Sequence, residues 1–240
     1  MRYYSIETSL NRKILGHYPQ IKKIIHHCAV WEDPCFIGRS NFEKININPI
    51  ISNPVLYQNS NLTDLIDVRG EIGFLFKLLV SEKLKNILTN SRKTGLQFFR
   101  SPIIQDDCLI NDYWILNMYE IDMNFIHLTK SSIVQRIRKP EGGTTLIDVE
   151  IESLESFMTE ITSKKLEGEL YFKNIIIKDN ILEDFFLLRY VEGGAKYVVS
   201  EKLKNEIEDA GCTGIEFQPV ELSIVEWLHG GEREKIYGKA

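Results

Sequence analysis

Two stretches of the chain repeat each other: VSEKLKNILTNSRKTGLQF at Val80–Phe98 and VSEKLKNEIEDAGCTGIEF at Val199–Phe217. They align without a gap at a shift of 119 residues, and ten of the 19 aligned positions are identical. Self-similarity at a fixed shift is the signature of a repeated structural unit. The sequence therefore predicts an internal duplication, with one copy of the unit in each half of the chain.

Each copy has the pattern of a strand, a helix, a turn and a second strand. Ser81 and Ser200 stand where a hydroxyl caps the first turn of a helix, and each is followed by Glu, which favours the positive end of the helix dipole. Apolar residues then recur at helical spacing. The pairs Thr94-Gly95 and Thr213-Gly214 mark a turn before an alternating apolar strand.

The rest of the chain is rich in strand signals with one further helix. Ser153–Thr162 has apolar residues at helical spacing, while Asn46–Thr63 is rich in Asn, Pro and Ser and is typical of irregular loop. The segment from Gly230 is polar, and we expect it to fray. Further strands are predicted at Asp112–Ile121, Thr144–Ile151, Glu169–Lys178 and Asp184–Val191.

These patterns predict an α+β protein built from two similar lobes, each with strands and a short capped helix. We place the N-terminal lobe at residues 1–110, the C-terminal lobe at residues 111–220 and a tail at residues 221–240. No low-complexity linker separates the halves, so we expect the two lobes to share an interface.

Charge and composition exclude several classes of function. The net charge is −5, and residues 121–240 carry 15 Lys and Arg against 22 Asp and Glu. Phosphate binding needs a basic field, so nucleic acid is not expected as the main ligand, whereas a basic protein partner is allowed. The sequence shows neither a secretory signal nor an apolar run long enough to cross a membrane. We expect a cytoplasmic protein with reduced cysteines.

The sequence contains no motif of known catalytic or cofactor chemistry. Neither a nucleophile elbow nor a glycine-rich phosphate loop is present. His26-His27-Cys28 with Cys35 is the one cluster that resembles metal ligands, but it has no second ligand pair at a suitable spacing. We therefore predict no enzyme activity, no cofactor and no metal site.

Acidic residues gather in two windows that lack Lys and Arg, residues 101–129 and 140–163. A negative surface steers and docks a basic partner, although most such runs only keep a protein soluble. If these windows have a function, it is to bind a partner protein. The candidate binding residues are Asp106, Asp107, Asp112, Glu150, Glu152 and Glu155.

In order and spacing, these segments resemble the family-eleven immunity proteins of bacterial polymorphic toxin systems. The resemblance rests on Thr63–Ile66 ahead of the first VSEKLKN, on YWILNMYEID at Tyr113–Asp122 followed by Lys130-Ser131, and on the segment from FFLLRY to Phe217. It implies a protein that binds a cognate toxin and blocks it, without catalytic residues. The toxin's chemistry and the oligomeric state stay open.

Three functions are compatible with the sequence. The leading hypothesis is stoichiometric occlusion of a toxin by a rigid two-lobed surface. The second is an enzyme whose site is assembled between the lobes from dispersed residues, which a pocket with strongly perturbed titratable groups would indicate. The third is a generic protein-binding adaptor.

Overall fold

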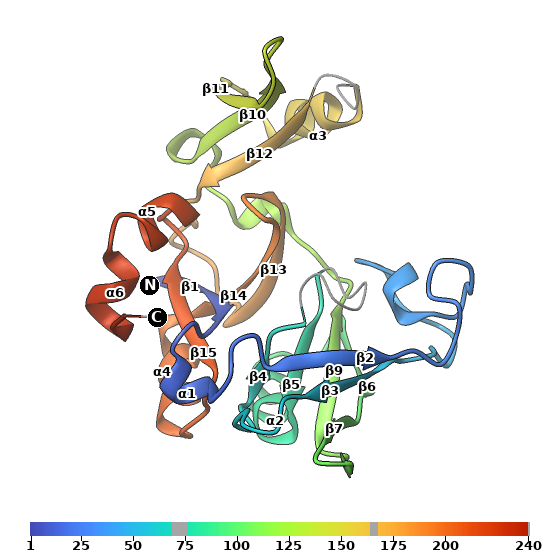
Figure 1. Cartoon of the computed structure of the whole chain (residues 1–240). Coiled ribbons are helices and arrows are strands. Elements are labelled where there is room, and N and C mark those ends of the chain that lie inside the picture. Colours follow the sequence, from blue (N-terminus) through green and yellow to red (C-terminus); the bar gives the residue numbers. More distant parts are fainter. Residues whose placement is uncertain (69–75, 164–167, 240) are drawn as a thin grey trace.

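The structure is a computed structural model, and it describes residues 1–68, 76–163 and 168–239. Helices and strands are mixed along the chain, which confirms the predicted α+β class. Figure 1 shows the arrangement of these elements, and the strands of the described ranges form three sheets. Two of the sheets contain the two copies of the repeat.

The first copy of the repeat forms a four-stranded sheet with one helix, α2 (Glu82–Ser91). Ser81 caps this helix as predicted, because its hydroxyl accepts a hydrogen bond from the amide of Leu84 at 3.2 Å. In spatial order the strands are β4 (Leu65–Ile66), β5 (Leu78–Ser81), β9 (Tyr113–Met118) and β6 (Leu96–Arg100).

The second copy repeats this arrangement within a seven-stranded sheet. Its helix is α4 (Glu201–Asp209), and Ser200 caps it by accepting from the amide of Leu203 at 3.2 Å. The four strands that match the first sheet are, in spatial order, β13 (Phe185–Val191), β14 (Gly194–Ser200), β1 (Tyr3–Thr8) and β15 (Ile215–Pro219).

In each of these two groups of four strands, the third strand in spatial order belongs to the opposite half of the sequence. β1 begins the chain but pairs with β14 and β15, while β9 follows residue 110 but pairs with β5 and β6. The registers also match, since Ser81 lies opposite Tyr113 and Ser200 lies opposite Tyr3. The two halves therefore exchange one strand each. Their common ancestry and the boundary at residue 110 stay predictions.

One hydrophobic core joins the two copies. The predicted stripe of Leu84 and Leu88 on α2 is confirmed, and so are Leu203 and Ile207 on α4, since all four are buried in the same cluster. Ala210, which we also expected in the second stripe, is exposed at the end of α4. The helices also touch directly, and Lys83 Nζ donates to the carbonyl oxygen of Gly211 at 2.9 Å. The lobes thus share an interior.

The seven-stranded sheet continues into an arm at the top of Figure 1. Phe157 of its helix packs on Phe172 with a centroid distance of 4.6 Å, and both are buried in a second core. We call residues 123–174 the α3 arm. It contains η2 (Met123–Phe125), η3 (Leu128–Lys130), β10 (Ser132–Arg138), β11 (Thr144–Asp148), α3 (Leu154–Ser163) and β12 (Glu169–Asn174).

A third sheet and a third core extend from the first half. The prediction of irregular loop at Asn46–Thr63 is wrong in part, because a strand occupies its middle and pairs with the strand that begins at Ile21. The elements are α1 (Arg12–Leu15), β2 (Ile21–Ile25), η1 (Ile37–Arg39), β3 (Asn53–Leu56), β7 (Ile103–Gln105) and β8 (Cys108–Ile110).

The prediction that the chain frays from Gly230 is wrong. Two short helices, α5 (Ile224–Leu228) and α6 (Glu232–Tyr237), pack beside β15. Arg233 forms a buried ion pair with Glu216 at 2.6 Å, and both side chains are almost fully inaccessible. The same carboxylate accepts from Ser9 Oγ and the amide of Leu10. The last helix is therefore fastened to both the N-terminal strand and β15.

Replacement of Arg233 by Met should destabilise the protein by about 3–5 kcal/mol, because it leaves the buried Glu216 carboxylate without its cation. Urea denaturation followed by circular dichroism measures the loss. The control is Lys235→Met, which removes an exposed ion pair with Glu232 and should cost about 1 kcal/mol or less. Equal losses in the two variants would contradict the role of the pair.

A chain that lacks residues 1–10 should fold poorly, because β14 and β15 lose the strand that lies between them. A synthetic peptide of residues 1–10 added in trans should restore thermal stability. The control peptide carries Ile6→Lys, which places a charge at a buried core position. The strand exchange would be unimportant for stability if the truncated chain unfolded at the wild-type temperature.

Candidate functional site

The six predicted binding residues are all exposed, but they lie in two separate groups. Asp106 and Asp107 form the turn between β7 and β8, with φ values of 50° and 59°, and Asp112 precedes β9. The other group, Glu150, Glu152 and Glu155, surrounds the start of α3. Figure 1 shows β7 at the bottom of the molecule and α3 at the top, so one contact surface of ordinary size does not hold both groups.

The start of α3 borders an open groove. Ser153 and Ser156 fix the first turn, because the amide of each donates to the hydroxyl of the other at 3.1 Å. Among the described residues, the groove has a volume of about 780 Å³, and its lining includes Leu154, Glu155 and Met158. Met158 is 38% exposed. An apolar floor with a carboxylate at its edge suits a side chain from a basic partner.

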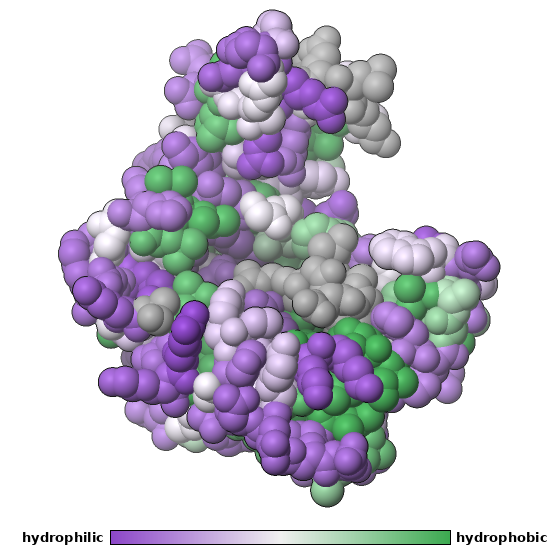
Figure 2. Space-filling view, in the orientation of Figure 1, coloured by the Kyte–Doolittle hydropathy of each residue, from purple (hydrophilic) through white to green (hydrophobic). Residues whose placement is uncertain are grey.

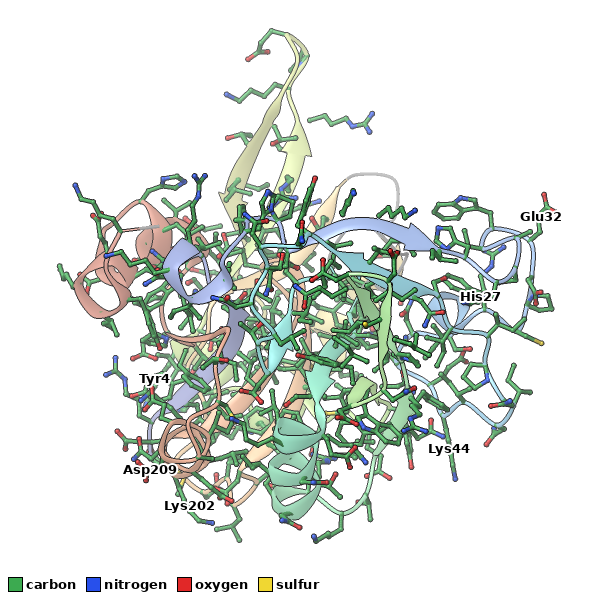
Figure 3. The ribbon with its side chains drawn as sticks, turned by 60° about the horizontal axis from the view of Figure 1, so that its bottom comes forward. Tyr4, His27, Glu32, Lys44, Lys202 and Asp209 are labelled. Atoms are coloured by element: carbon green, nitrogen blue, oxygen red, sulfur yellow. The ribbon has the colours of Figure 1, made fainter. Side chains whose placement is uncertain are left out.

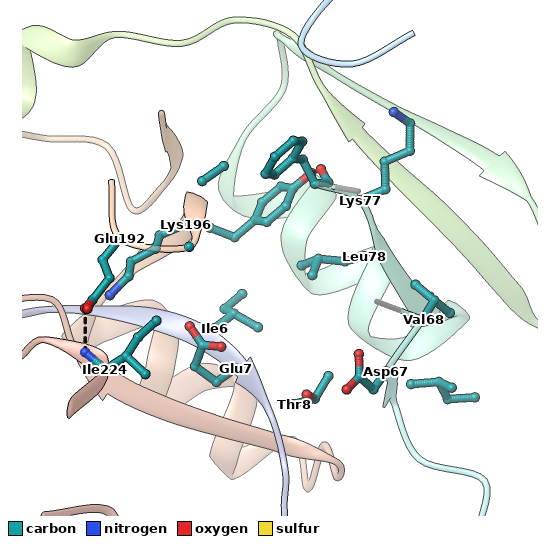
Figure 4. A pocket seen from close by; sticks show the side chains of 15 residues that line it. Ile6, Glu7, Thr8, Asp67, Val68, Lys77, Leu78, Glu192, Lys196 and Ile224 are labelled. Carbon is teal, nitrogen blue, oxygen red and sulfur yellow. Dashed lines mark hydrogen bonds between the residues drawn. The ribbon is translucent and has the colours of Figure 1, made fainter. Parts of the chain in front are cut away.

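A smaller and more enclosed cavity of about 190 Å³ lies between the two lobes (Figure 4). Its walls come from β1, from both sides of the β4–β5 connection, from β14 and from α5. The described lining contains no His, Cys or Ser. The apolar residues are Ile6, Ile66, Val68, Phe76, Leu78, Ala195, Tyr197 and Ile224, and the charged ones are Glu7, Asp67, Lys77, Glu192 and Lys196.

The lobes approach closely at this cavity. Tyr197 Oη donates to the carbonyl oxygen of Phe76 at 2.8 Å, which joins β14 to the segment before β5. Gly194 has a φ of +90°, and a Cβ added there would lie 2.7 Å from the Phe76 ring. Only glycine tolerates both the backbone conformation and this contact. Glycine at position 194 is therefore required for β14 and Phe76 to form this wall of the cavity.

Lys196 is the unusual polar group of the cavity. It is 4% exposed, and within the described part of the chain its Nζ has no hydrogen-bond partner. Burial lowers the pKa of Lys196, while the nearby carboxylates of Glu7 and Glu192 oppose this effect. Glu192 is held in place, since it accepts a hydrogen bond from the amide of Ile224 at 2.6 Å. A buried amine without a partner is costly and is therefore a candidate for ligand binding.

Lys77 is a second buried lysine, but its amine is directed away from Lys196 (Figure 4). Lys77 Nζ donates to the carbonyl oxygen of Ser40 at 2.5 Å and to Oδ1 of Asn41 at 2.8 Å. Burial lowers the pKa of Lys77 to about 8. These hydrogen bonds hold the 40–41 segment against β5, so the role of Lys77 is structural.

His26 and His27, from the one cluster in the sequence that resembles metal ligands, are hydrogen-bonded to polar side chains. His26 Nδ1 is hydrogen-bonded to Ser52 Oγ at 2.8 Å, and His27 Nε2 contacts Asn53 Oδ1. Figure 3 shows His27 and Glu32 in the outer part of the third sheet and its loop, far from Tyr4 and Lys202. In the described ranges no group of three or more His, Cys, Asp or Glu is arranged to hold a metal ion.

The sequence analysis did not single out Lys196. The one available signal was a lysine within the apolar strand that precedes the second helix, GGAKYVV. Its burial depends on residues distant in the sequence, because β1, the segment before β5 and α5 all line the cavity beside it.

Between pH 8 and 10.5, the stability of the wild type should rise relative to that of Lys77→Met. The folded state releases the Lys77 proton near pH 8, whereas the unfolded chain keeps it to about pH 10.5. The unfolded state then binds more protons, so the free energy of unfolding increases with pH, by at most about 3 kcal/mol. Urea denaturation at several pH values measures the difference. Parallel profiles for the two proteins would contradict it.

Comparison with known proteins gives a family for this chain. Among the described residues, no helix has the length and apolar character that crossing a membrane requires. No curated protein matches the chain. A family model described as the immunity protein family Imm11 matches residues 2–222, which is nearly the whole chain. The chain therefore belongs to the Imm11 immunity protein family.

Proposed function

We propose that this protein neutralises a cognate bacterial toxin by binding it stoichiometrically in the cytoplasm and covering its active site or substrate path. The family match over residues 2–222 carries the proposal, because an immunity family points to toxin neutralisation by a non-enzymatic route. The core shared by the two copies of the repeat supports it too, because pre-organised surfaces move little on binding.

The α3 arm is the contact surface that we favour. It projects from the body of the molecule, and its groove combines Leu154 and Met158 with the carboxylate of Glu155. Glu150 and Glu152 lie just before the helix and add negative charge at the same end. An apolar centre with a charged rim is the usual composition of a protein interface of about 1,600 Å². The partner segment is then basic with an apolar anchor.

Other exposed apolar residues lie on the C-terminal helices. Val225 and Leu228 of α5 and Ile236 of α6 are 58%, 41% and 61% exposed. Figure 2 shows apolar side chains gathered on the surface over α5. None of the six predicted acidic binding residues lies beside this patch, so it is our second choice for the contact surface.

The first experiment is to co-express the protein with the product of the neighbouring toxin-like gene and to score growth and co-purification. We expect growth rescue together with a stable complex of fixed stoichiometry. Rescue without any complex would indicate enzymatic reversal of the damage instead. Continued toxicity despite soluble expression would exclude neutralisation of that toxin.

Replacement of Glu150, Glu152 and Glu155 together by Gln should weaken toxin binding about tenfold at low salt and flatten its salt dependence. Three exposed charges contribute a few tenths to one kcal/mol each. Isothermal titration calorimetry at two ionic strengths measures the effect.

The matched control replaces Asp106, Asp107 and Asp112 by Asn, which tolerates the positive φ of the β7–β8 turn. This variant should bind as the wild type does. If the aspartate variant bound more weakly and the glutamate variant bound as the wild type does, the contact would lie at the β7–β8 end of the molecule. Unchanged affinity in both variants would show that the acidic residues only keep the protein soluble.

A further inference from the structure

The cavity between the lobes has the properties of a built binding site. Its volume is about 190 Å³. A cavity of about 150 Å³ accommodates a benzene molecule, so this one holds an aromatic ring with one small substituent. Ile6, Leu78 and Ile224 contribute apolar surface to its walls. A compact apolar body therefore fits inside.

The polar groups are concentrated at one end of this cavity. Figure 4 shows the Lys196 amine at the end that Glu192 and Ile224 border. Lys196 Nζ has no partner among the described residues, so its three donors are available. Glu192 Oε2 accepts from the amide of Ile224, and the carboxylate has a second oxygen that can accept a further hydrogen bond. A donor and an acceptor thus stand near each other.

The charges around the cavity favour a neutral ligand. The carboxylates of Glu7 and Glu192 line the same cavity as Lys196. They would repel an anionic ligand, while the Lys196 ammonium would repel a cationic one. A neutral group that both accepts and donates hydrogen bonds can pair with Lys196 and with Glu192 at the same time.

We propose that the inter-lobe cavity binds a primary carboxamide with a compact, aromatic-sized body. Its carbonyl oxygen accepts a hydrogen bond from Lys196, its NH₂ group donates to Glu192, and its apolar body contacts Ile6 and Leu78. The ligand is a free small molecule, because the carboxamides of Asn and Gln side chains carry no body of this size. This inference goes beyond the proposed toxin binding and needs no toxin for its test.

The probe is benzamide, titrated calorimetrically into the full chain. We expect saturable binding, and we expect benzoate and N,N-dimethylbenzamide to bind at least tenfold more weakly. Benzoate carries the wrong charge, and the dimethyl compound has no N–H donor. A charge-assisted hydrogen bond contributes about 1.5–3 kcal/mol, which corresponds to a tenfold change or more.

Two variants test the residues. Lys196→Met removes the donor and should abolish benzamide binding without lowering the unfolding temperature, because it also removes a buried amine without a partner. Ala195→Leu fills the cavity from its wall and should block binding independently of charge. Lys23→Met on β2, which is exposed in a different sheet, is the control and should bind as the wild type does.

Absence of saturable benzamide binding, or equal binding by wild type and Lys196→Met, would overturn the proposal. Benzoate binding as tight as benzamide binding would overturn the assigned ligand class. Failure of toxin binding in the experiments above leaves these results unaffected.

Discussion

The insertion of β1 between β14 and β15 is the constraint on which the rest of the structure depends. The N-terminal strand completes a sheet formed by residues about 200 positions away, and β9 performs the same task in the other sheet. Such long-range pairing has a high cost in loop-closure entropy and must be balanced by burial. The shared core of α2 and α4 provides that burial, so neither half has a complete sheet or a complete core by itself.

The same exchange creates the features that distinguish one lobe from the other. In each half, a long segment connects the exchanged strand to the hairpin that precedes the helix. Residues 9–64 contain the elements of the third sheet up to β3, and residues 119–184 contain the α3 arm. Both segments leave and re-enter the paired scaffold at equivalent positions. The scaffold can therefore stay constant while these segments carry the surfaces that contact a partner.

The sequence repeat was enough to predict the capped helices, their apolar stripes and the flanking strands, because these depend on local spacing. The strand exchange was not predictable, since Tyr3-Tyr4 and Tyr113-Trp114 share little beyond one tyrosine and lie at a different shift from the repeat. The helix at the C-terminus was missed for another reason. Its sequence is polar, and Arg233 is buried only through its pairing with a distant glutamate.

Among the candidate site residues, the exposed acids were visible in the sequence because charge windows need no tertiary information. Their division into two distant groups was not visible, since it depends on how the sheets stack. Lys196 shows the opposite case. A lysine in a strand is ordinarily placed at the surface, and Lys196 is buried because segments distant in the sequence, including Phe76 and Ile224, line the cavity beside it. Its amine has no hydrogen-bond partner in the described part of the chain, and burying such a group costs stability, which is why the proposed ligand site is placed at this cavity.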